Sequence, residues 1–560
     1  MEDCEILCLE TGTTDDVIDV LKKFIDKHNQ SFIFEDLNQN GRRQKLWSSL
    51  FHHLDNSAEV SCCKYCLSCI RLISRDKTGL NELICNKWLE TLLHHAGLVP
   101  QKEASSSINE SPVNYEVMLE ALKCLCNIIF HSPYAKALSS KNNSLEGVLM
   151  LLRTYKDPEL PYEIKFYNVK VLFLITAFHE KVAPDLNREL LVCLTDILDL
   201  ILKEVEREEH DDKGEATSSV IKITLYDNQV ELACGVLQTL FNLTMNSAKQ
   251  HAFDDEMAEF LRLASILHDF LLCATQPCEK QYELHRNVVN LLMNLPENCY
   301  EKLMTPVQRS LHDTDKGPEY DGKNMKAVAV LLDFLSYKLD SAEQDVSSQY
   351  ELVCPIMFVM VNCVNCHRSM RKFLRQRVLP PLTEVHSRPE EGTTLRNKLC
   401  RLLTSCVMQV RDLADQFLFI LCKENVMRMV KYTGYGNAAG FLARSGAMLG
   451  ESNNLSSTSG AQYSSDSEDS DTEEYKKFKS QINIMTGCCE KPHPDPMESM
   501  SEEQKEFEAL ELVKKLDKLT RDGIMQPCRI GEDGRPEPVG HVLELIENLS
   551  QLQIKPSEDD

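Results

Sequence analysis

A short apolar motif that recurs along the chain constrains its fold most. The motif has two apolar residues three positions apart and a small polar residue two positions further on, as in Leu122, Leu125 and Asn127 of LKCLCNI. LQTLFNL and VNLLMNL repeat it and end on Asn242 and Asn294, while CIRLISR, VLFLITA and LCRLLTS are looser copies. The copies are unevenly spaced at about fifty residues, which is typical of armadillo or HEAT units with insertions.

The polar residue of each copy is a candidate for a binding surface. Apolar residues three apart share one helical face and pack between layers, so the polar residue that follows turns off that face. If each copy is the last helix of a repeat, the polar residues form a ladder along one concave wall. An asparagine there either pairs with the backbone of a bound helix or extended peptide, or caps its own helix. The predicted ladder residues are Asn127, Thr176, Asn242 and Asn294.

The motif and the composition together predict an all-α protein, an armadillo/HEAT-like right-handed helical-repeat superhelix. We expect the repeat body to span residues 1–445. Residues 446–498 are rich in Ser, Gly, Asn and acidic residues, which predicts a disordered linker. A tail helix is expected at 499–522, and a mostly disordered tail at 523–560.

The net charge of −25 bears on the kind of partner and on the compartment. Nucleic-acid binding needs a basic surface, so the charge argues against a nucleic-acid partner. The sequence has no apolar run of the roughly 18 residues that a membrane span needs, and no signal peptide. Most of the 23 cysteines lie in apolar helical segments, as buried thiols in a reducing compartment do. We therefore expect a cytoplasmic monomer that does not span a membrane.

Three strings resemble ligand motifs but lack their context. Cys63, Cys66 and Cys69 form overlapping C-x-x-C pairs, yet no second pair follows at zinc-ribbon spacing, which favours helix packing. CVNCH at 363–367 matches a c-type haem string, but it lies in a helical run without an export signal. The glycines of 431–443 follow a helical pair, whereas a phosphate-binding loop follows a strand. We expect no metal, no cofactor and no catalytic residue.

Two sets of basic residues each share a helical face. Arg71 and Arg75 follow the first copy of the motif, and they suit either a guest's carboxylate or surface ion pairs. Arg371, Lys372 and Arg375 lie together in HRSMRKFLRQRVLPPL, where like charges repel by about 0.2–0.5 kcal/mol per pair. The acidic segment YSSDSEDSDTEEY downstream is the nearest candidate to offset this repulsion.

The acidic segment contains two candidate phosphorylation sites. Ser465 and Ser470 are each followed by a glutamate three residues later, the pattern that an acidophilic protein kinase reads. Each phosphate adds about −1.5 to −2 charge units and suits docking on the basic helix. The alternative is a solvated acidic linker without a partner.

The stretch MSEEQKEFEALELVKKLDKLTR predicts the tail helix. Ser501 and Gln504 form a capping box at its start. A tethered helix with one apolar face docks either on the body or on a partner. Its apolar stripe consists of Phe507, Leu510, Val513 and Leu516.

Several stretches in order along nearly the whole chain resemble the synembryns, also called the resistance-to-inhibitors-of-cholinesterase proteins. The loops at 100–112 and 305–324 and the end after about residue 525 match poorly. The stretches are KHNQSFIF, RLISRDK, ALKCLCNIIF, RKFLRQRVLPPL, LRNKLCRLLT, KYTGYGNAAGFLA, SDTEEY and MSEEQKEFEALELVKKLDKL.

This resemblance implies a cytosolic exchange factor and folding chaperone for α subunits of heterotrimeric G proteins. It implies an armadillo/HEAT superhelix that holds the α subunit's C-terminal helix in its concave groove, while the tail reaches the GTPase switch region. The factor accepts the GDP-bound α subunit, stabilises its nucleotide-free state and is ejected by GTP. Recruitment to the cell cortex or the inner face of the plasma membrane would bring it to such clients.

The resemblance also assigns residues. Arg71 and Arg75 fall on the family's paired groove arginines, and Asn127 on the asparagine of the next repeat. Ser465 and Ser470 fall on two sites of an acidophilic kinase, and the basic helix falls where the family docks that phosphorylated segment. The CVNCH string departs from the family pattern and receives no role. The alternative function is a passive armadillo adaptor that binds peptides without changing nucleotide release.

Overall fold

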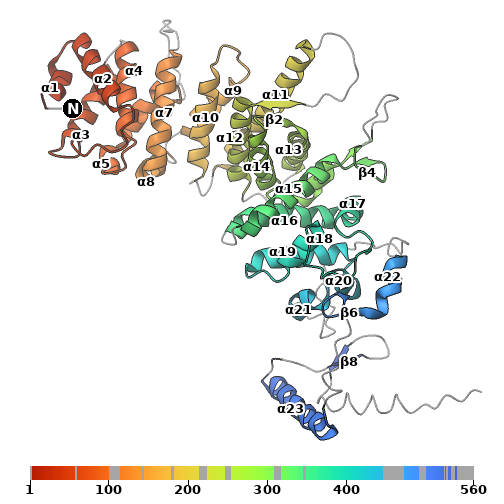
Figure 1. Ribbon diagram of the computed structural model, residues 1–560. Coiled ribbons are helices and arrows are strands. Elements are labelled where there is room, and N and C mark those ends of the chain that lie inside the picture. Colours follow the sequence, from red (N-terminus) through yellow and green to blue (C-terminus); the bar gives the residue numbers. More distant parts are fainter. Residues whose placement is uncertain are drawn as a thin grey trace, which may run out of the picture. The chain divides into compact units, whose positions relative to one another are not determined.

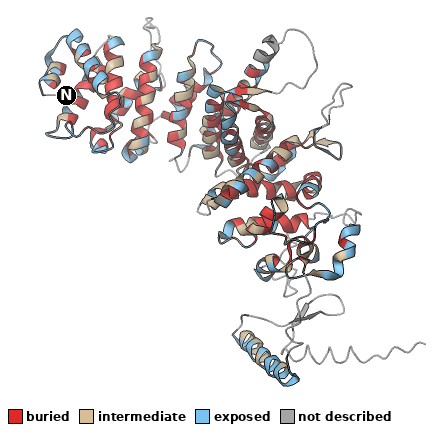
Figure 2. Ribbon diagram, viewed as in Figure 1, coloured by how far each residue is buried: buried red, intermediate tan, exposed pale blue. Residues whose placement is uncertain are grey.

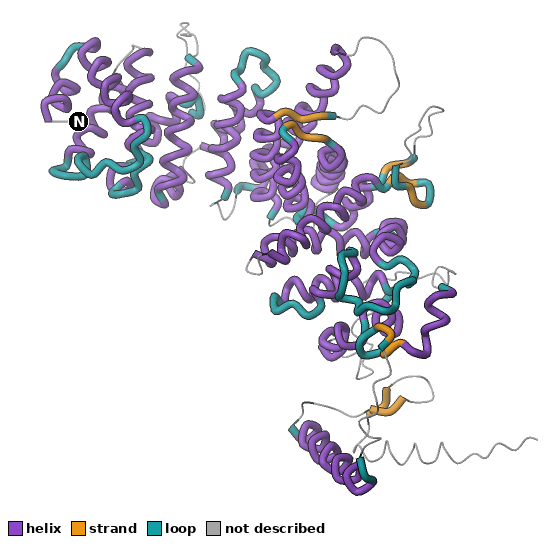
Figure 3. Tube along the Cα trace, in the orientation of Figure 1, coloured by secondary structure: helices purple, strands orange, loops and turns teal. Residues whose placement is uncertain are grey.

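The computed structural model describes residues 3–56, 60–99, 114–139, 144–177, 182–212, 223–245, 254–307, 317–344, 348–444, 472–490, 500–522, 524, 528–530 and 536–538. Helices account for most of these residues, which confirms the predicted all-α repeat fold (Figures 1 and 3). The chain forms two compact units. The N-terminal unit comprises residues 1–303 and 308–316, and the C-terminal unit comprises residues 304–307 and 317–560.

The described part of the N-terminal unit consists mainly of helices and contains one parallel pair of short strands, β1 and β2. The α-helices are α1 (Asp3–Thr11), α2 (Thr14–His28), α3 (Arg42–Asn56), α4 (Val60–Ile73), α5 (Leu80–Leu83), α6 (Asn86–His95), α7 (Tyr115–His131), α8 (Pro133–Ser139), α9 (Ser144–Arg153), α10 (Tyr162–Thr176), α11 (Pro184–Asp212), α12 (Asp227–Thr244), α13 (Asp254–Leu272) and α14 (Gln281–Leu292). The remaining elements are β1 (Thr224–Tyr226), β2 (Ala274–Gln276) and the 3-10 helices η2 (Cys278–Lys280) and η3 (Glu297–Leu303).

The last helix of each repeat packs on the last helix of the next. α4 lies against α7, α7 against α10, α10 against α12, and α12 against α14. The motif residues Leu122, Leu125, Leu237 and Leu240 have no exposed surface, and Figure 2 shows buried residues along the facing sides of the helices. The predicted role of the motif as a packing face is confirmed, since its apolar positions fill the layers between neighbouring helices.

The described part of the C-terminal unit also consists mainly of helices. Its elements are β3 (Thr305–Pro306), β4 (Glu319–Tyr320), β5 (Lys323–Asn324), α15 (Lys326–Gln344), α16 (Gln349–Cys366), α17 (Arg368–Val378), α18 (Leu395–Leu402), α19 (Met408–Leu421), α20 (Val426–Thr433), α21 (Tyr435–Arg444), α22 (Glu473–Phe478), η6 (Lys479–Gln481), β6 (Ile482–Asn483), β7 (Cys488–Cys489), α23 (Glu502–Arg521), β8 (Cys528–Ile530) and β9 (Pro536–Pro538). β3, β5 and β4 form a small antiparallel sheet, and β6 pairs with β7.

Helix α16 is more apolar than expected, since the sequence analysis finds no apolar run as long as a membrane span. Among the described helices it is long and apolar enough to cross a membrane by length and composition alone, and half of that window is buried. α16 packs against α15, α17 and α19. Its apolar character therefore matches its place among other helices, because a core helix meets apolar neighbours on several sides.

A segment after the acidic region folds back on the C-terminal unit. We call residues 472–490 the strap. At its start, the Thr472 hydroxyl donates a hydrogen bond to the Leu382 carbonyl. Near its end, the Cys489 amide donates to the Val385 carbonyl at 2.7 Å. The sequence predicts disorder throughout 446–498, and the strap corrects this for its own residues, because backbone pairing and packing offset the cost of ordering a polar segment.

The strap packs against the glycine-rich stretch that precedes the acidic region. The amides of Tyr435 and Gly436 donate to strap carbonyls at 2.9 and 2.8 Å. Gly434 and Gly487 have φ values of +75° and +73°, which L side chains rarely adopt. A Cβ on Gly487 would lie 2.9 Å from the Gly434 Cα. These two glycines thus serve a close approach of two backbones.

Candidate partner-binding site

A hollow of about 710 Å³ lies on the row formed by α4, α7 and α10. We call it the basic groove, because its lining combines cationic and aromatic side chains. It brings together the sequence-predicted Arg71, Arg75 and Asn127. The lining residues are Phe32, Arg71, Arg75, Lys77, Lys123, Cys126, Asn127, Phe130, His131, Tyr167, Lys170 and Leu174.

A carboxylate beneath the groove holds Arg71. The Arg71 Nε donates to Glu120 Oε2 at 2.8 Å, Lys123 Nζ donates to Glu120 Oε1 at 3.0 Å, and the Ser68 hydroxyl donates to Oε2 at 3.0 Å. Glu120 is 9% exposed. Burial opposes ionisation of Glu120, but the charges and hydrogen bonds of Arg71 and Lys123 prevail and lower its pKa. The carboxylate is therefore ionised and holds both cations.

Arg75 is held differently, by uncharged groups. Its Nη1 donates to the Asn29 carbonyl at 2.6 Å, and its guanidinium lies over the Phe32 ring, 5.3 Å from the ring centroid. Phe32 is 67% exposed, although it belongs to a large apolar residue class that is usually buried. Because these partners are uncharged, they leave the charge of Arg75 un-neutralised in the groove.

The ladder residues bind the neighbouring repeat. Asn127 Nδ2 donates to the Arg71 carbonyl at 3.2 Å. Asn242 Nδ2 donates to the Thr176 hydroxyl at 3.2 Å and to the Phe173 carbonyl at 3.4 Å. In each case the acceptors lie in the last turn of the preceding stacked helix, where carbonyls lack intrahelical partners.

The next step of the ladder repeats this geometry. Asn294 Nδ2 donates to the Phe241 carbonyl at 2.9 Å and to the Thr244 hydroxyl at 3.1 Å. Thr176 is buried, and its hydroxyl donates to the Leu172 carbonyl at 2.9 Å. The amide groups of Asn242 and Asn294 thus join consecutive repeats, and binding of a guest by the ladder stays a prediction. Thr176, Asn242 and Asn294 do not line the basic groove.

The predicted basic helix is α17, and two of its cations are buried. Arg371 and Arg375 are 8% and 7% exposed. Arg371 Nη1 donates to the Val364 carbonyl, and Arg375 Nη1 to the Leu421 carbonyl, both at 2.9 Å. These acceptors lie in the last turns of α16 and α19. Cations there meet the negative end of the helix dipole, which offsets their mutual repulsion.

Lys372 lies on the more open side of α17. It lines a hollow of about 440 Å³ together with Tyr320, Asp321, Arg368 and Ser369. Ser465 and Ser470 lie outside the described residues, so docking of a phosphorylated segment on α17 stays a prediction. The strap nevertheless begins two residues after Ser470, at Thr472.

The tail helix forms as the sequence predicts. Ser501 caps α23, and Gln504 completes the capping box. No residue of α23 is buried. Phe507 and Leu510 are 64% and 60% exposed, while Val513 and Leu516 are partly exposed. The apolar stripe is thus accessible to a partner.

The cysteine strings are built into helices. Cys63, Cys66 and Cys69 are buried in α4, and a hydrogen bond with Cys62 together with burial raises the pKa of Cys66. Cys363 is buried in α16, where burial raises the pKa of its thiol. Thiols with raised pKa values are poor thiolate ligands and nucleophiles at neutral pH.

Another carboxylate that pairs with arginine lies in the C-terminal unit and behaves oppositely to Glu120. Asp415 of α19 is 1% exposed and accepts a hydrogen bond from Arg444 at the end of α21. Its other oxygen has no hydrogen-bond partner among the described residues. Burial raises the pKa of Asp415 to about 7, although Arg444 opposes the shift. A single cation does not compensate the lost hydration.

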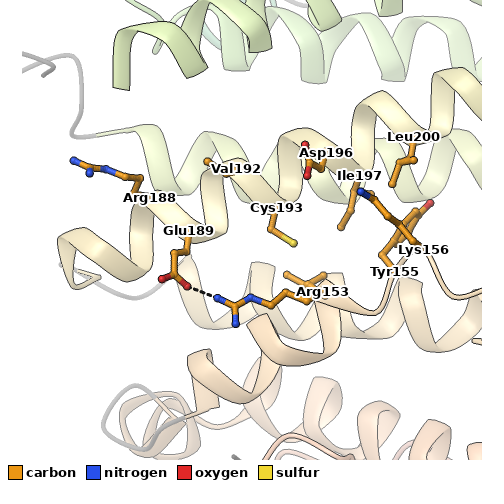
Figure 4. Close-up of a pocket in the computed structure, with 11 residues that line it drawn as sticks. Arg153, Tyr155, Lys156, Arg188, Glu189, Val192, Cys193, Asp196, Ile197 and Leu200 are labelled. Carbon is orange, nitrogen blue, oxygen red and sulfur yellow. Dashed lines mark hydrogen bonds and ion pairs between the residues drawn. The ribbon is translucent and has the colours of Figure 1, made fainter. Parts of the chain in front are cut away.

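A second hollow of the N-terminal unit lies between α9, the turn after it and α11 (Figure 4). Its volume is about 400 Å³. Arg153 and Glu189 point toward one another across it, and their ion pair measures 2.6 Å (Figure 4). None of the sequence-predicted site residues lines this hollow.

Sequence reasoning missed part of the basic groove. Lys123 and Phe130 lie one turn before and after Asn127 on the same helix, so helical spacing from Asn127 indicates both. Glu120 lies one further turn back, and nothing in its spacing distinguishes it from a surface glutamate. Tyr167 and Lys170 come from α10, and only the stacking of the repeats brings them to the groove.

The arrangement defines a helical-repeat protein with a basic, aromatic-lined binding groove, which suits an acidic or carboxylate-bearing peptide segment. Among solved structures, one from a study of cadherin and β-catenin aligns with 79% of this chain and 90% of its own, at a TM-score of 0.28 and 11% identity. That likeness is too low to add to the fold assignment.

The sequence comparisons identify the family. Residues 66–535 match the Ric8 family, described as guanine nucleotide exchange factor synembryn. The chain is similar to proteins named Chaperone Ric-8A, with 38% identity to that of Gallus gallus over 96% of each chain. The relative from Danio rerio is 37% identical over 94% of this chain and 93% of its own. The chain belongs to the Ric8, or synembryn, family, which confirms the resemblance noted from the sequence.

Proposed function

We propose that the protein is a guanine nucleotide exchange factor and folding chaperone for α subunits of heterotrimeric G proteins. The family's exchange-factor description and the relatives' name as chaperones support both activities. The observation that carries the proposal is the basic groove, where Arg71, Arg75 and aromatic side chains lie together on three stacked helices. The groove captures the C-terminal helix of the α subunit, and the arginines meet its carboxylate groups.

Exchange then follows from differential binding. A protein that binds the nucleotide-free α subunit more tightly than the GDP-bound form shifts the client toward the nucleotide-free form. GDP leaves, GTP enters, and the GTP-bound form has low affinity for the factor, because the coupling between nucleotide and factor is reciprocal. No bond is made or broken by this chain, so the activity is not enzymatic in the chemical sense.

The tail helix α23 supplies the second contact of the proposed complex. Its exposed stripe at Phe507, Leu510, Val513 and Leu516 suits an apolar surface near the client's switch region. If the helix buries this stripe only when the client is bound, the burial stabilises the complex and not the free protein. This contact supports a clamp in which the groove and the tail hold different parts of the client.

An acidophilic kinase regulates the clamp in this proposal. Phosphates on Ser465 and Ser470 add negative charge just before the strap, and α17 offers Arg371, Lys372 and Arg375 as docking partners. The protein acts as a monomer in the cytoplasm and is recruited to the inner face of the plasma membrane. Among the described residues, the cysteines from Cys4 to Cys489 form no disulfide, and a reducing compartment keeps thiols in this state.

The test is uptake of a non-hydrolysable GTP analogue by GDP-loaded α subunits of several classes, with and without the full-length protein. Faster uptake by at least one class is the expected result and identifies the client. Binding without faster uptake in any class would reject exchange activity and leave a passive adaptor or a chaperone alone. Refolding yields of newly synthesised α subunits with and without the protein then decide between these two.

A further inference from the structure

The charge balance beneath the basic groove is unexpected for a site that attracts anions. Glu120 is a carboxylate directly below the groove, and a buried negative charge there weakens the attraction of any anionic ligand. A carboxylate at this position therefore needs a role that offsets the weaker attraction. The geometry around it provides one.

Glu120 fixes the direction of Arg71. The carboxylate takes the Nε of Arg71 at 2.8 Å. Among the described residues, neither Nη1 nor Nη2 of Arg71 has a hydrogen-bond partner, and Arg71 lines the groove. A guanidinium tethered through Nε keeps its two terminal nitrogens together and presents them as a fork that matches a carboxylate.

Two further bonds hold Glu120 itself. Ser68 donates to the oxygen that Arg71 uses, and Lys123 donates to the other oxygen. Because Ser68 belongs to α4 and Lys123 to α7, the carboxylate is held from both helices and has little freedom to follow a moving arginine. Asn127 also ties α7 to the Arg71 carbonyl at 3.2 Å. Arg71 is thus fixed at both its backbone and its Nε.

We infer that Glu120 is a positioning residue that presets Arg71, and with it Lys123, for a carboxylate of the bound segment. The inference rests on the proposed function, since it names how the groove recognises its client. A preset cation loses less conformational entropy on binding than a free one, which favours affinity despite the added negative charge. Arg75 has no such carboxylate beside it, so its charge attracts the carboxylate of the bound segment without fixing its orientation.

This role predicts the sign of an effect. Glu120→Gln keeps the shape but removes the negative charge, so electrostatics alone predicts tighter binding of an anionic peptide. Positioning predicts weaker binding, by about tenfold if one preset charge-assisted contact is lost. The matched control is Glu116→Gln, one turn earlier on α7, whose exposed carboxylate pairs with Lys64 at 2.8 Å outside the groove.

The experiment uses the full chain and a labelled peptide with the sequence of a client α subunit's C-terminal helix. The peptide is made with a free terminal carboxylate and as an amide. We expect wild type to prefer the free acid, Glu120→Gln to lose about tenfold in affinity and most of this preference, and Glu116→Gln to match wild type. Equal or tighter binding by Glu120→Gln would overturn the inference.

Two further variants separate positioning from general damage. In an Arg71→Ala background, Glu120→Gln should cause no additional loss, because it acts through Arg71; an additional loss of similar size would contradict the inference. Ser68→Ala keeps every charge and should weaken binding by about two- to threefold. If wild type binds neither peptide, the groove proposal itself fails, a result distinct from failure of the Glu120 variant alone.

Discussion

The basic groove and the basic helix α17 use similar residues for different purposes. Each has two arginines four residues apart, with Arg71 in α4 and Arg75 in the turn after it, and with Arg371 and Arg375 both in α17. Arg71 and Arg75 lie near the C-terminal end of α4 and reach a hollow, while Arg371 and Arg375 lie among buried residues of α17 and donate to backbone carbonyls. The comparison teaches that spacing identifies a cationic face, and that the neighbouring apolar residues decide whether this face is buried.

The largest effect is expected at the groove. Arg71→Glu with Arg75→Glu should weaken client binding by about a hundredfold or more, because two attractive contacts become repulsive. Titration calorimetry with the nucleotide-free client measures this. The control is Arg153→Glu with Arg188→Glu, which changes the net charge equally on exposed side chains of the same unit. Unchanged affinity of the Arg71 and Arg75 variant would remove the groove assignment.

The second effect is on stability and concerns α17. Arg375→Ala should lower the free energy of unfolding by about 2–3 kcal/mol, since it leaves the Leu421 carbonyl without its cationic donor and opens a cavity. Chemical denaturation checks this, with exposed Gln376→Ala as the control. If Arg375→Ala proved as stable as wild type, the contrast between the two basic faces would be lost.

Glu120 and Asp415 both accept hydrogen bonds from arginines, but their pKa values shift in opposite directions, so the two regions should differ in how their stability depends on pH. Glu120 has a lowered pKa, whereas Asp415 has a pKa of about 7. Between about pH 4, where an exposed aspartate titrates, and pH 7 the folded state binds more protons at Asp415 than the unfolded state. Stability therefore falls as the pH rises through this window, by on the order of 4 kcal/mol. Asp415→Asn should remove this dependence.

The measurement is the urea midpoint at several pH values between 5 and 8. Asp333→Asn is the control, because Asp333 is an exposed carboxylate on α15 of the same unit. Subtracting the variant's pH profile from that of wild type isolates Asp415. A flat difference would show that Asp415 titrates as an exposed carboxyl does.

The ladder should contribute smaller increments. Asn242→Ala and Asn294→Ala should each cost about 1 kcal/mol of stability, since each removes a donor to the preceding repeat. Client affinity should stay within about twofold of wild type, because neither residue lines the groove. Thr404→Ala is the control, as its exposed hydroxyl bonds only within its own helix end. A loss of affinity without a loss of stability would return these asparagines to the binding surface.

The smallest effect is regulatory. Ser465→Ala with Ser470→Ala should abolish the gain in exchange rate that kinase treatment produces in wild type, a gain we expect to be about two- to threefold, because the phosphates are lost that would pair with α17. Ser456→Ala with Ser457→Ala is the control, since these serines lack a glutamate three residues later. Equal stimulation of both double variants would contradict phosphate docking.

The sequence anticipates what depends on local spacing and fails where distant segments meet. The repeat motif predicts the stacked helices, and Ser501 with Gln504 predicts the start of α23. Glu120 and Tyr167 escape prediction, because helix stacking alone determines their neighbours. The strap also escapes prediction, since its polar composition resembles that of a linker. Two of the carbonyls that it bonds, those of Leu382 and Val385, lie about a hundred residues earlier in the chain.

The strap changes where the chain can be divided. A protein shortened at residue 450 loses the tail helix, but it also loses Tyr475, whose buried ring has its centroid 4.5 Å from Lys431 Nζ. The amides of Tyr435 and Gly436 lose the strap carbonyls to which they donate. Weak activity of such a fragment would therefore report damage to α20 and α21 as much as absence of the tail. A cut after residue 490 keeps the strap in place and removes the tail helix together with β8 and β9. For the same reason, a protease nick between 445 and 471 leaves both halves held together.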